Sequence, residues 1–140
     1  MYIFFGSCCY GDFSFYYKNS HAEIIKRFGL KINPQETTKK HFDSVVSLTS
    51  RLAEHNLTIF NHSFNYLCFG SWEIIVGSGH KERKFSWDGR DFLLEVSDRI
   101  KTNMTQGGEW KVVYQKPLGN IKDEELFETV FQLAVELKHN

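Results

Sequence analysis

The sequence predicts an α+β fold, a mainly antiparallel sheet with a long central helix and a C-terminal helix packed against it. Three observations lead to this prediction. Residues 34–55 carry apolar side chains at helical spacing. Between residues 57 and 115, short runs of apolar residues, several of them alternating with polar ones, are separated by turn signals, a pattern typical of an antiparallel meander. From residue 123 to about 138 the helical spacing returns, with a wide apolar face.

Length and composition indicate a single folded domain spanning residues 1–140. The chain has 140 residues, 41% hydrophobic and 16% aromatic, with only 2 Pro, which is too much core material for a disordered chain. Seventeen cations balance seventeen anions. This balance argues against a dedicated binder of duplex nucleic acid and against a polybasic membrane-surface protein. The three cysteines and the absence of an export signal predict reduced thiols in a cytoplasmic protein.

The N-terminal region predicts two strands, 2–5 and 12–18, followed by a short helix from Ser20 to Phe28. The long helix then begins near Pro34, whose missing N–H is tolerated in a first turn, and ends at Asn56. Its predicted buried face consists of Phe42, Val45, Val46, Thr49, Leu52 and Ala53.

The central region predicts strands at 57–61, 65–70, 72–77, 82–87, 91–97 and 110–115. Asp88-Gly89 between two apolar runs indicates a tight hairpin, because Gly accepts a positive φ without steric cost. Phe85 and Trp87 are expected on one face of the first strand, and Phe92, Leu94 and Val96 on one face of the second. Residues 98–109 are expected to form a flexible loop, and Asp123 is expected to cap the last helix.

No motif in the chain predicts catalytic chemistry. The six histidines are scattered and Cys8-Cys9 lacks the spacer of a zinc site, while phosphate-loop, nucleophile-elbow and dinucleotide-binding patterns do not occur. We therefore expect no catalytic residue, no cofactor and no metal. The alternative is an enzyme or small-molecule-binding protein with an aromatic-lined pocket between sheet and helices. Its candidate residues are His62, Cys68 and Glu73.

The surplus of aromatic residues favours a protein-contact surface, because Tyr and Trp are preferred anchors at interfaces. Packing inside the core is an equally good explanation of the same residues. The candidate interaction residues are Tyr16, Tyr66, Trp72, Trp110, Lys81, Arg83 and Lys84. The acidic start of the last helix, Asp123 to Glu125, is the better candidate for a cationic partner. Basic clusters beside aromatics also leave open single-stranded nucleic acid binding.

The C-terminal part of the chain contains three features in series: the hairpin Phe85-x-Trp87-Asp88-Gly89-x-x-x-x-Leu94, a later strand with Trp110 and a closing helix. In these features it resembles small orphan bacterial proteins, namely immunity proteins and mobile gene-cassette products. The resemblance covers about the last 60 residues and carries over no functional residue. It implies a cytosolic accessory protein that binds a partner. The leading hypothesis is thus a small, non-catalytic interaction protein with a protein partner, possible homodimerisation, and neither duplex nucleic acid nor membrane as a target.

Overall fold

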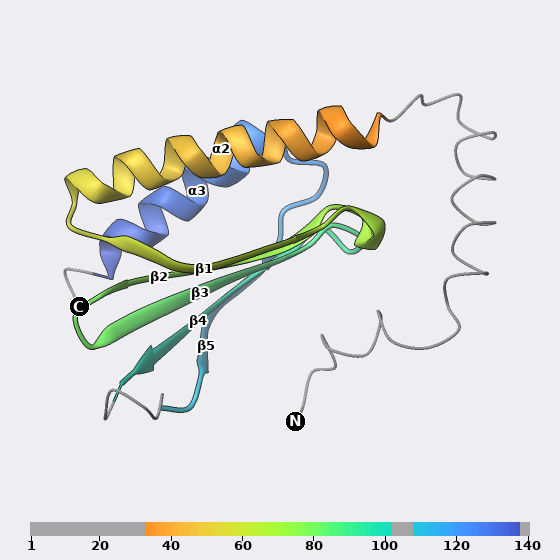
Figure 1. Cartoon of the computed structure of the whole chain (residues 1–140). Coiled ribbons are helices and arrows are strands. Elements are labelled where there is room, and N and C mark those ends of the chain that lie inside the picture. The colour runs from red at the N-terminus through yellow and green to blue at the C-terminus, as the bar shows by residue number, and fades with distance from the viewer. Residues whose placement is uncertain (1–32, 102–107, 138–140) are drawn as a thin grey trace. The chain divides into compact units, whose positions relative to one another are not determined.

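The computed structural model describes residues 33–101 and 108–137 (Figure 1). The chain divides into two units, Met1–Pro34 and Gln35–Asn140. Its elements are α2 (Pro34–Glu54), β1 (Thr58–Asn65), the short 3₁₀ helix η1 (Tyr66–Cys68), β2 (Ser71–Ser78), β3 (Lys81–Asp88), β4 (Leu93–Ile100), β5 (Lys111–Pro117) and α3 (Asp123–Glu136). The strands predicted at 2–5 and 12–18, the helix predicted at Ser20–Phe28 and Tyr16 lie outside the described residues, and whether the chain is a single domain stays a prediction.

The five strands form one antiparallel sheet in the order β1-β2-β3-β4-β5, so each strand pairs with its neighbours in sequence. Figure 1 shows α2 and α3 on the same side of this sheet. The predicted α+β class is confirmed. The core lies between the two layers and contains residues of both helices and of the helix-facing side of the strands: Leu48, Leu52, Leu57, Trp72, Ile74, Val76, Phe85, Trp87, Leu94, Val96, Leu126, Phe127, Val130, Ala134 and Leu137.

The long helix forms almost as predicted, but a different face of it is buried. Asn56 follows the helix with a positive φ of 54°, and the N–H of Leu57 bonds the carbonyl of Leu52, which closes the C-terminus. The buried side chains are His41, Leu48 and Leu52. Phe42 and Val46, predicted to be buried, are 47% and 65% exposed. The predicted face was rotated about the helix axis: it included Leu52, which is buried, but it left out His41 and Leu48 and included the exposed Thr49 and Ala53.

Two boundaries also differ from the prediction. The strands predicted at 57–61 and 65–70 are one strand, β1, followed by η1, whose N-terminal cap is the Asn65 side chain. Asp123 is the first residue of α3 rather than its cap, and the capping residue Lys122 makes no side-chain bond there. Within the described residues, no helix is long and apolar enough to cross a bilayer.

Candidate functional site

Two groups of polar and aromatic side chains lie on opposite faces of the sheet. On the face away from the helices, Glu82, Lys84 and Ser86 of β3 are opposite Arg99, Ser97 and Glu95 of β4. Alternation along the strands fixes this assignment, because Phe85 and Val96 between them belong to the core. We use the name cation–aromatic face for Phe60, Glu82, Lys84, Arg99, Lys101 and Trp110, which contact one another on this side of the sheet.

Glu82 is the centre of the cation–aromatic face. Its side chain is only 2% exposed and accepts hydrogen bonds from Arg99 Nε at 2.6 Å and Lys101 Nζ at 2.5 Å. Burial by itself would raise the pKa of this carboxyl, but the bonds from Lys101 and Arg99 outweigh it and lower the pKa below the usual range. Glu82 is therefore ionised at neutral pH, and its single negative charge is shared between the two cations.

The same cations lie over aromatic rings. Arg99 Cζ and Lys84 Nζ are 4.3 Å and 4.9 Å from the centroid of the Trp110 ring, and Lys101 Nζ is 5.1 Å from that of Phe60. Such contacts hold flat rings and long side chains in one arrangement. They lie on the same side of the sheet as the buried Ser97 and Glu82, opposite the side on which α2 and α3 lie. Beside Trp110, Val112 and Val113 of β5 remain 54% and 53% exposed.

On the helix-facing side, His41 of α2 meets His62 of β1. Their Nε2 atoms are 2.8 Å apart, and the ring centroids are 5.1 Å apart with planes differing by 19°, so the rings meet end to end. Four aromatic rings surround His41, and we call them the aromatic box: Phe42, Phe64, Trp72 and Phe127. Phe64 stacks on His41 at 4.1 Å. The pair thus lies between α2 and the sheet, the region where the pocket was predicted.

The surroundings keep both imidazoles neutral. Burial lowers the pKa of His41 to about 4, with a further contribution from the nearby His62, and burial also lowers the pKa of His62. One ring must donate its Nε2–H and the other must accept. Within the described residues, Nδ1 of the buried His41 has no hydrogen-bond partner. An unpaired acceptor is less costly there than an unpaired donor, so we assign His41 as the donor and His62 as the acceptor.

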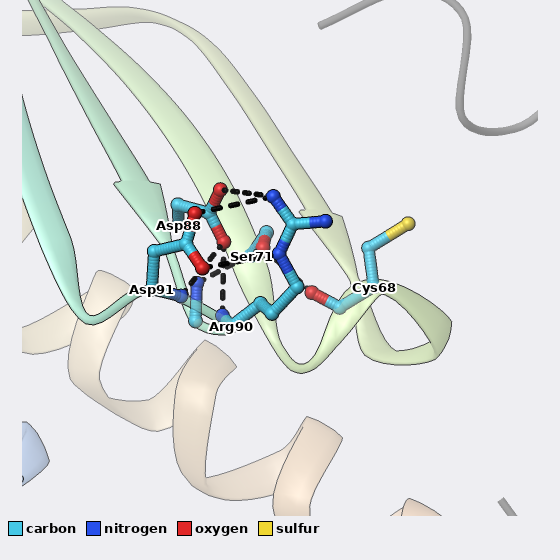
Figure 2. Close-up of polar contacts among 6 residues, drawn as sticks. Cys68, Ser71, Asp88, Arg90 and Asp91 are labelled. Atoms are coloured by element: carbon cyan, nitrogen blue, oxygen red, sulfur yellow. Dashed lines mark hydrogen bonds and ion pairs between the residues drawn. The ribbon is translucent and has the colours of Figure 1, made fainter. Parts of the chain in front are cut away.

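A third polar cluster connects two loops at one end of the sheet through hydrogen bonds (Figure 2). Ser71 Oγ donates to the carbonyl of Cys68 at 2.6 Å and accepts from the N–H of Gly89 at 3.0 Å. The Asp88 carboxylate accepts from the N–H groups of Arg90 and Asp91, which closes the β3–β4 turn. In Figure 2 the Cys68 sulfur points away from Asp88 and Asp91. These two hydrogen bonds of Ser71 join backbone groups of two loops, which is a structural role.

The β3–β4 turn differs from the predicted tight hairpin. It spans residues 89–92 between Asp88 and Leu93, and the residue with positive φ is Phe92, at 51°, rather than Gly89. Phe92 is consequently 42% exposed instead of sharing the core face of Leu94 and Val96. Gly89 is required for a different reason: a Cβ there would lie 2.0 Å from the carbonyl oxygen of Phe69.

The predicted interaction residues are distributed over several parts of the molecule. Lys84 and Trp110 come together on the cation–aromatic face. Trp72 is 5% exposed and stacks on Phe127 in the core. Arg83 is 6% exposed and binds Asp98 with two bonds of 2.6 Å. Lys81 lies on the sheet face opposite to Lys84, and Tyr66 belongs to η1.

The predicted pocket residues are not all adjacent. In the β1–β2 pairing, His62 is the partner of Ile74, and Ser63 is the partner of Glu73. Paired residues share a face and successive residues alternate, so the side chains of His62 and Glu73 lie on different faces of the sheet. Glu73 accepts a long hydrogen bond from Ser86, at 3.5 Å. Cys68 is half-buried in η1 at the end of β1. Of the three, only His62 lies between the sheet and the helices.

Sequence reasoning missed His41, Glu82 and Arg99. Glu82 and Arg99 belong to polar rows on a sheet face, and only the β3–β4 register brings them together. A local signal did exist for His41, since it lies at helical spacing from Val45, Leu48 and Leu52, and a scoring that admitted histidine would have found it.

Among the described residues, no group of three or more His, Cys, Asp and Glu side chains is arranged to hold a metal ion. Comparison of the chain with protein-family models, with curated proteins and with solved structures finds no match in any of the three.

Proposed function

We propose that this chain is a small, non-catalytic binding protein that contacts a protein partner through the cation–aromatic face and the neighbouring strand β5. The observation that supports this proposal is the arrangement around Trp110. A Trp held by Arg99 and Lys84 next to two half-exposed valines combines the residue types that dominate binding energy at protein interfaces. Because the rings and cations are already fixed, binding would lose little side-chain entropy.

Charge favours a protein over single-stranded nucleic acid as the partner. Arg99 and Lys101 are both paired to Glu82, so of the cations on this face only Lys84 has no ion pair within the described residues. A nucleic acid binder needs uncompensated cations along the backbone path. The protein should therefore pass through a polyanion column at low salt. Retention that weakens steeply with salt would favour the nucleic acid instead.

The test is affinity capture from the native host with three baits: the natural protein, Trp110→Ala and Val46→Ala. Val46 is 65% exposed on α2 and serves as the matched control, because it removes exposed apolar surface from the other side of the molecule. We expect one protein to be captured by the natural chain and by Val46→Ala, and its recovery to fall at least about tenfold with Trp110→Ala, since hot-spot truncations weaken binding by about 2 kcal/mol or more. Equal recovery with all three baits would contradict this choice of surface.

A second candidate function, binding of a small molecule between the sheet and helices, has one observation in its favour. The two neutral imidazoles of His41 and His62 in the aromatic box combine apolar walls with polar atoms, as ligand pockets do. A ligand bound there should raise the melting temperature of the natural protein and not that of His62→Ala. Shifts that are equal in both proteins would remove this alternative.

A further inference from the structure

The contacts of α2 with the rest of the molecule are unevenly distributed along the helix. The segment from residue 48 to its end is held by two fully buried leucines, Leu48 and Leu52, at 2% and 0% exposure. In the preceding fourteen residues, 34–47, His41 is the only buried side chain. We call residues 34–47 the leading segment. His41 is thus the most deeply buried attachment of this segment, beside the partly buried Val45 and the contacts of Phe42 with the rings of His62 and Phe64.

Two kinds of contact hold that histidine. The first is the 2.8 Å hydrogen bond from His41 to His62 on β1. The second is ring packing against Phe64, Trp72 and Phe127, which belong to β1, β2 and α3 respectively. Both require a neutral, close-packed imidazole. A change of charge at this one position therefore affects all the contacts that the leading segment makes through His41.

We propose that the His41–His62 pair is an acid-sensitive latch: it holds the leading segment of α2 on the sheet at neutral pH and releases it on acidification, which uncovers Phe64, Trp72 and Phe127. The pair accepts an additional proton poorly in the closed state. A cation on His41 would be buried among four aromatic rings without a carboxylate, and a cation on His62 would force His41 to carry its proton on the unpartnered Nδ1. Two cations with Nε2 atoms 2.8 Å apart would repel strongly.

Within residues 33–101 and 108–137, the elements packed around the pair provide no compensating charge. His62 is the titratable group facing His41 from β1, while β2 and α3 present Trp72 and Phe127. On α2 the neighbouring charges are Lys40, which is paired with Glu36, and Lys39, which is paired with Asp43. The carboxylates Asp123 and Glu124 of α3 act on the exposed Lys40 rather than on His41. Protonation is therefore relieved only when His41 leaves the aromatic box.

The expected change in the open-to-closed ratio of the leading segment is large enough to measure. With a pKa of about 4 in the closed state and 6.5 when solvated, His41 alone should raise the open-to-closed ratio roughly 30-fold between pH 7.5 and pH 5. The direction follows from linkage, because the open state binds the proton more tightly and so gains population as pH falls.

Hydrogen–deuterium exchange of the full chain at pH 7.5 and pH 5 tests the latch, with rates converted to protection factors so that the intrinsic effect of pH is removed. Amides of residues 38–47 report the leading segment, and amides of 52–54, whose carbonyl acceptors lie outside that segment, are the internal control in the same helix. We expect protection in the leading segment to fall about 30-fold at pH 5, and that of 52–54 to fall much less. Equal losses in both parts, or no loss, would overturn the proposal.

Variants identify the group responsible. His41→Phe fills the aromatic box with a ring that cannot be protonated, so it should abolish the extra loss at pH 5, whereas His80→Gln, at an exposed turn, should keep it. An undiminished acid response in His41→Phe would show that another group is responsible. If His41→Phe fails to fold, the comparison of the two parts of α2 in the natural protein still decides between release of the leading segment and uniform destabilisation.

Discussion

Gly89 illustrates, at the scale of one residue, how a correct sequence signal can have a different physical cause. The Asp-Gly pair correctly predicted a turn between two strands, but the expected reason was a positive φ. Here Gly89 has no positive φ, and what the site excludes is a side chain, because a Cβ would meet the Phe69 carbonyl. The neighbouring loop that supplies this carbonyl is far from the turn in sequence, so no local pattern could reveal it.

We therefore predict that Gly89→Ala destabilises the fold by about 1–3 kcal/mol, because a backbone atom at 2.0 Å must move to admit the methyl group. Urea unfolding measures the change. Gly79→Asn is the matched control: its φ is +62°, its Cβ would meet nothing within 4 Å, and Asn tolerates this backbone region. A larger loss for Gly79→Asn than for Gly89→Ala would contradict the steric explanation.

At the scale of elements, Arg83 connects helix α3 to the sheet. Its guanidinium binds Asp98 of β4 through two bonds of 2.6 Å and also donates to the carbonyl of Leu133 in the last turn of α3. We predict that Arg83→Leu lowers the free energy of unfolding by roughly 3 kcal/mol, because it leaves a mostly buried carboxylate without its partner.

The double variant Arg83→Leu/Asp98→Leu separates this cause from simple loss of packing. The double variant also removes the Asp98 carboxylate, which Arg83→Leu leaves without a partner, so it should recover part of the stability lost in Arg83→Leu. Chemical denaturation of both proteins gives the comparison. A double variant less stable than Arg83→Leu alone would mean that the charge left behind is not what destabilises the single variant.

Strand β5 is an edge of the sheet and carries features that discourage pairing with another chain. Lys111 and Lys116 flank its exposed valines, Pro117 ends it, and the pairing with β4 shifts between Val96 and Ser97. We predict that Lys111→Val/Lys116→Val associates into dimers or larger species by analytical ultracentrifugation. Lys39→Val/Lys40→Val, with the same change of charge on helix α2, should associate less. Similar association of both variants would point to net charge instead of the strand edge.

The elements were largely predictable from sequence, while the candidate sites were not. Helical spacing in 34–55 and the apolar runs before and after Asp88 are local properties, and they correctly predicted α2, β3 and β4 to within a few residues. The rotation of α2 about its axis depends on Phe64, Trp72 and Phe127 of the aromatic box, which three other elements supply. Similarly, Glu82 contacts Arg99 and Lys101 only because of the register in which β3 pairs with β4. Sites assembled in this way require the tertiary structure.

At the scale of the whole molecule, groups with lowered pKa values make stability depend on pH in two ranges, and His41 and Glu82 are the most deeply buried of them. His41 remains neutral in the folded state down to about pH 4, whereas in the unfolded chain it takes up a proton near pH 6.5. The unfolded state therefore binds more protons in this interval, and stability falls as pH falls from 6.5 to about 4. The full difference corresponds to roughly 3 kcal/mol.

Glu82 acts at lower pH. The pKa of this carboxyl is lowered in the folded state, so its contribution to stability is complete above the unfolded value of 4.5 and is lost as pH falls through the folded value. Urea unfolding between pH 7.5 and pH 3 should therefore show two successive losses. His41→Phe should remove most of the loss between pH 6.5 and 4 and leave the one below 4.5, the remainder of the first loss coming from His62, whose pKa is also lowered by burial. Glu82→Gln should do the reverse, because it removes the carboxylate that Arg99 and Lys101 hold ionised. If His41→Phe retained the whole of the first loss, His41 would not be its source, and the acid response would have to come from other groups.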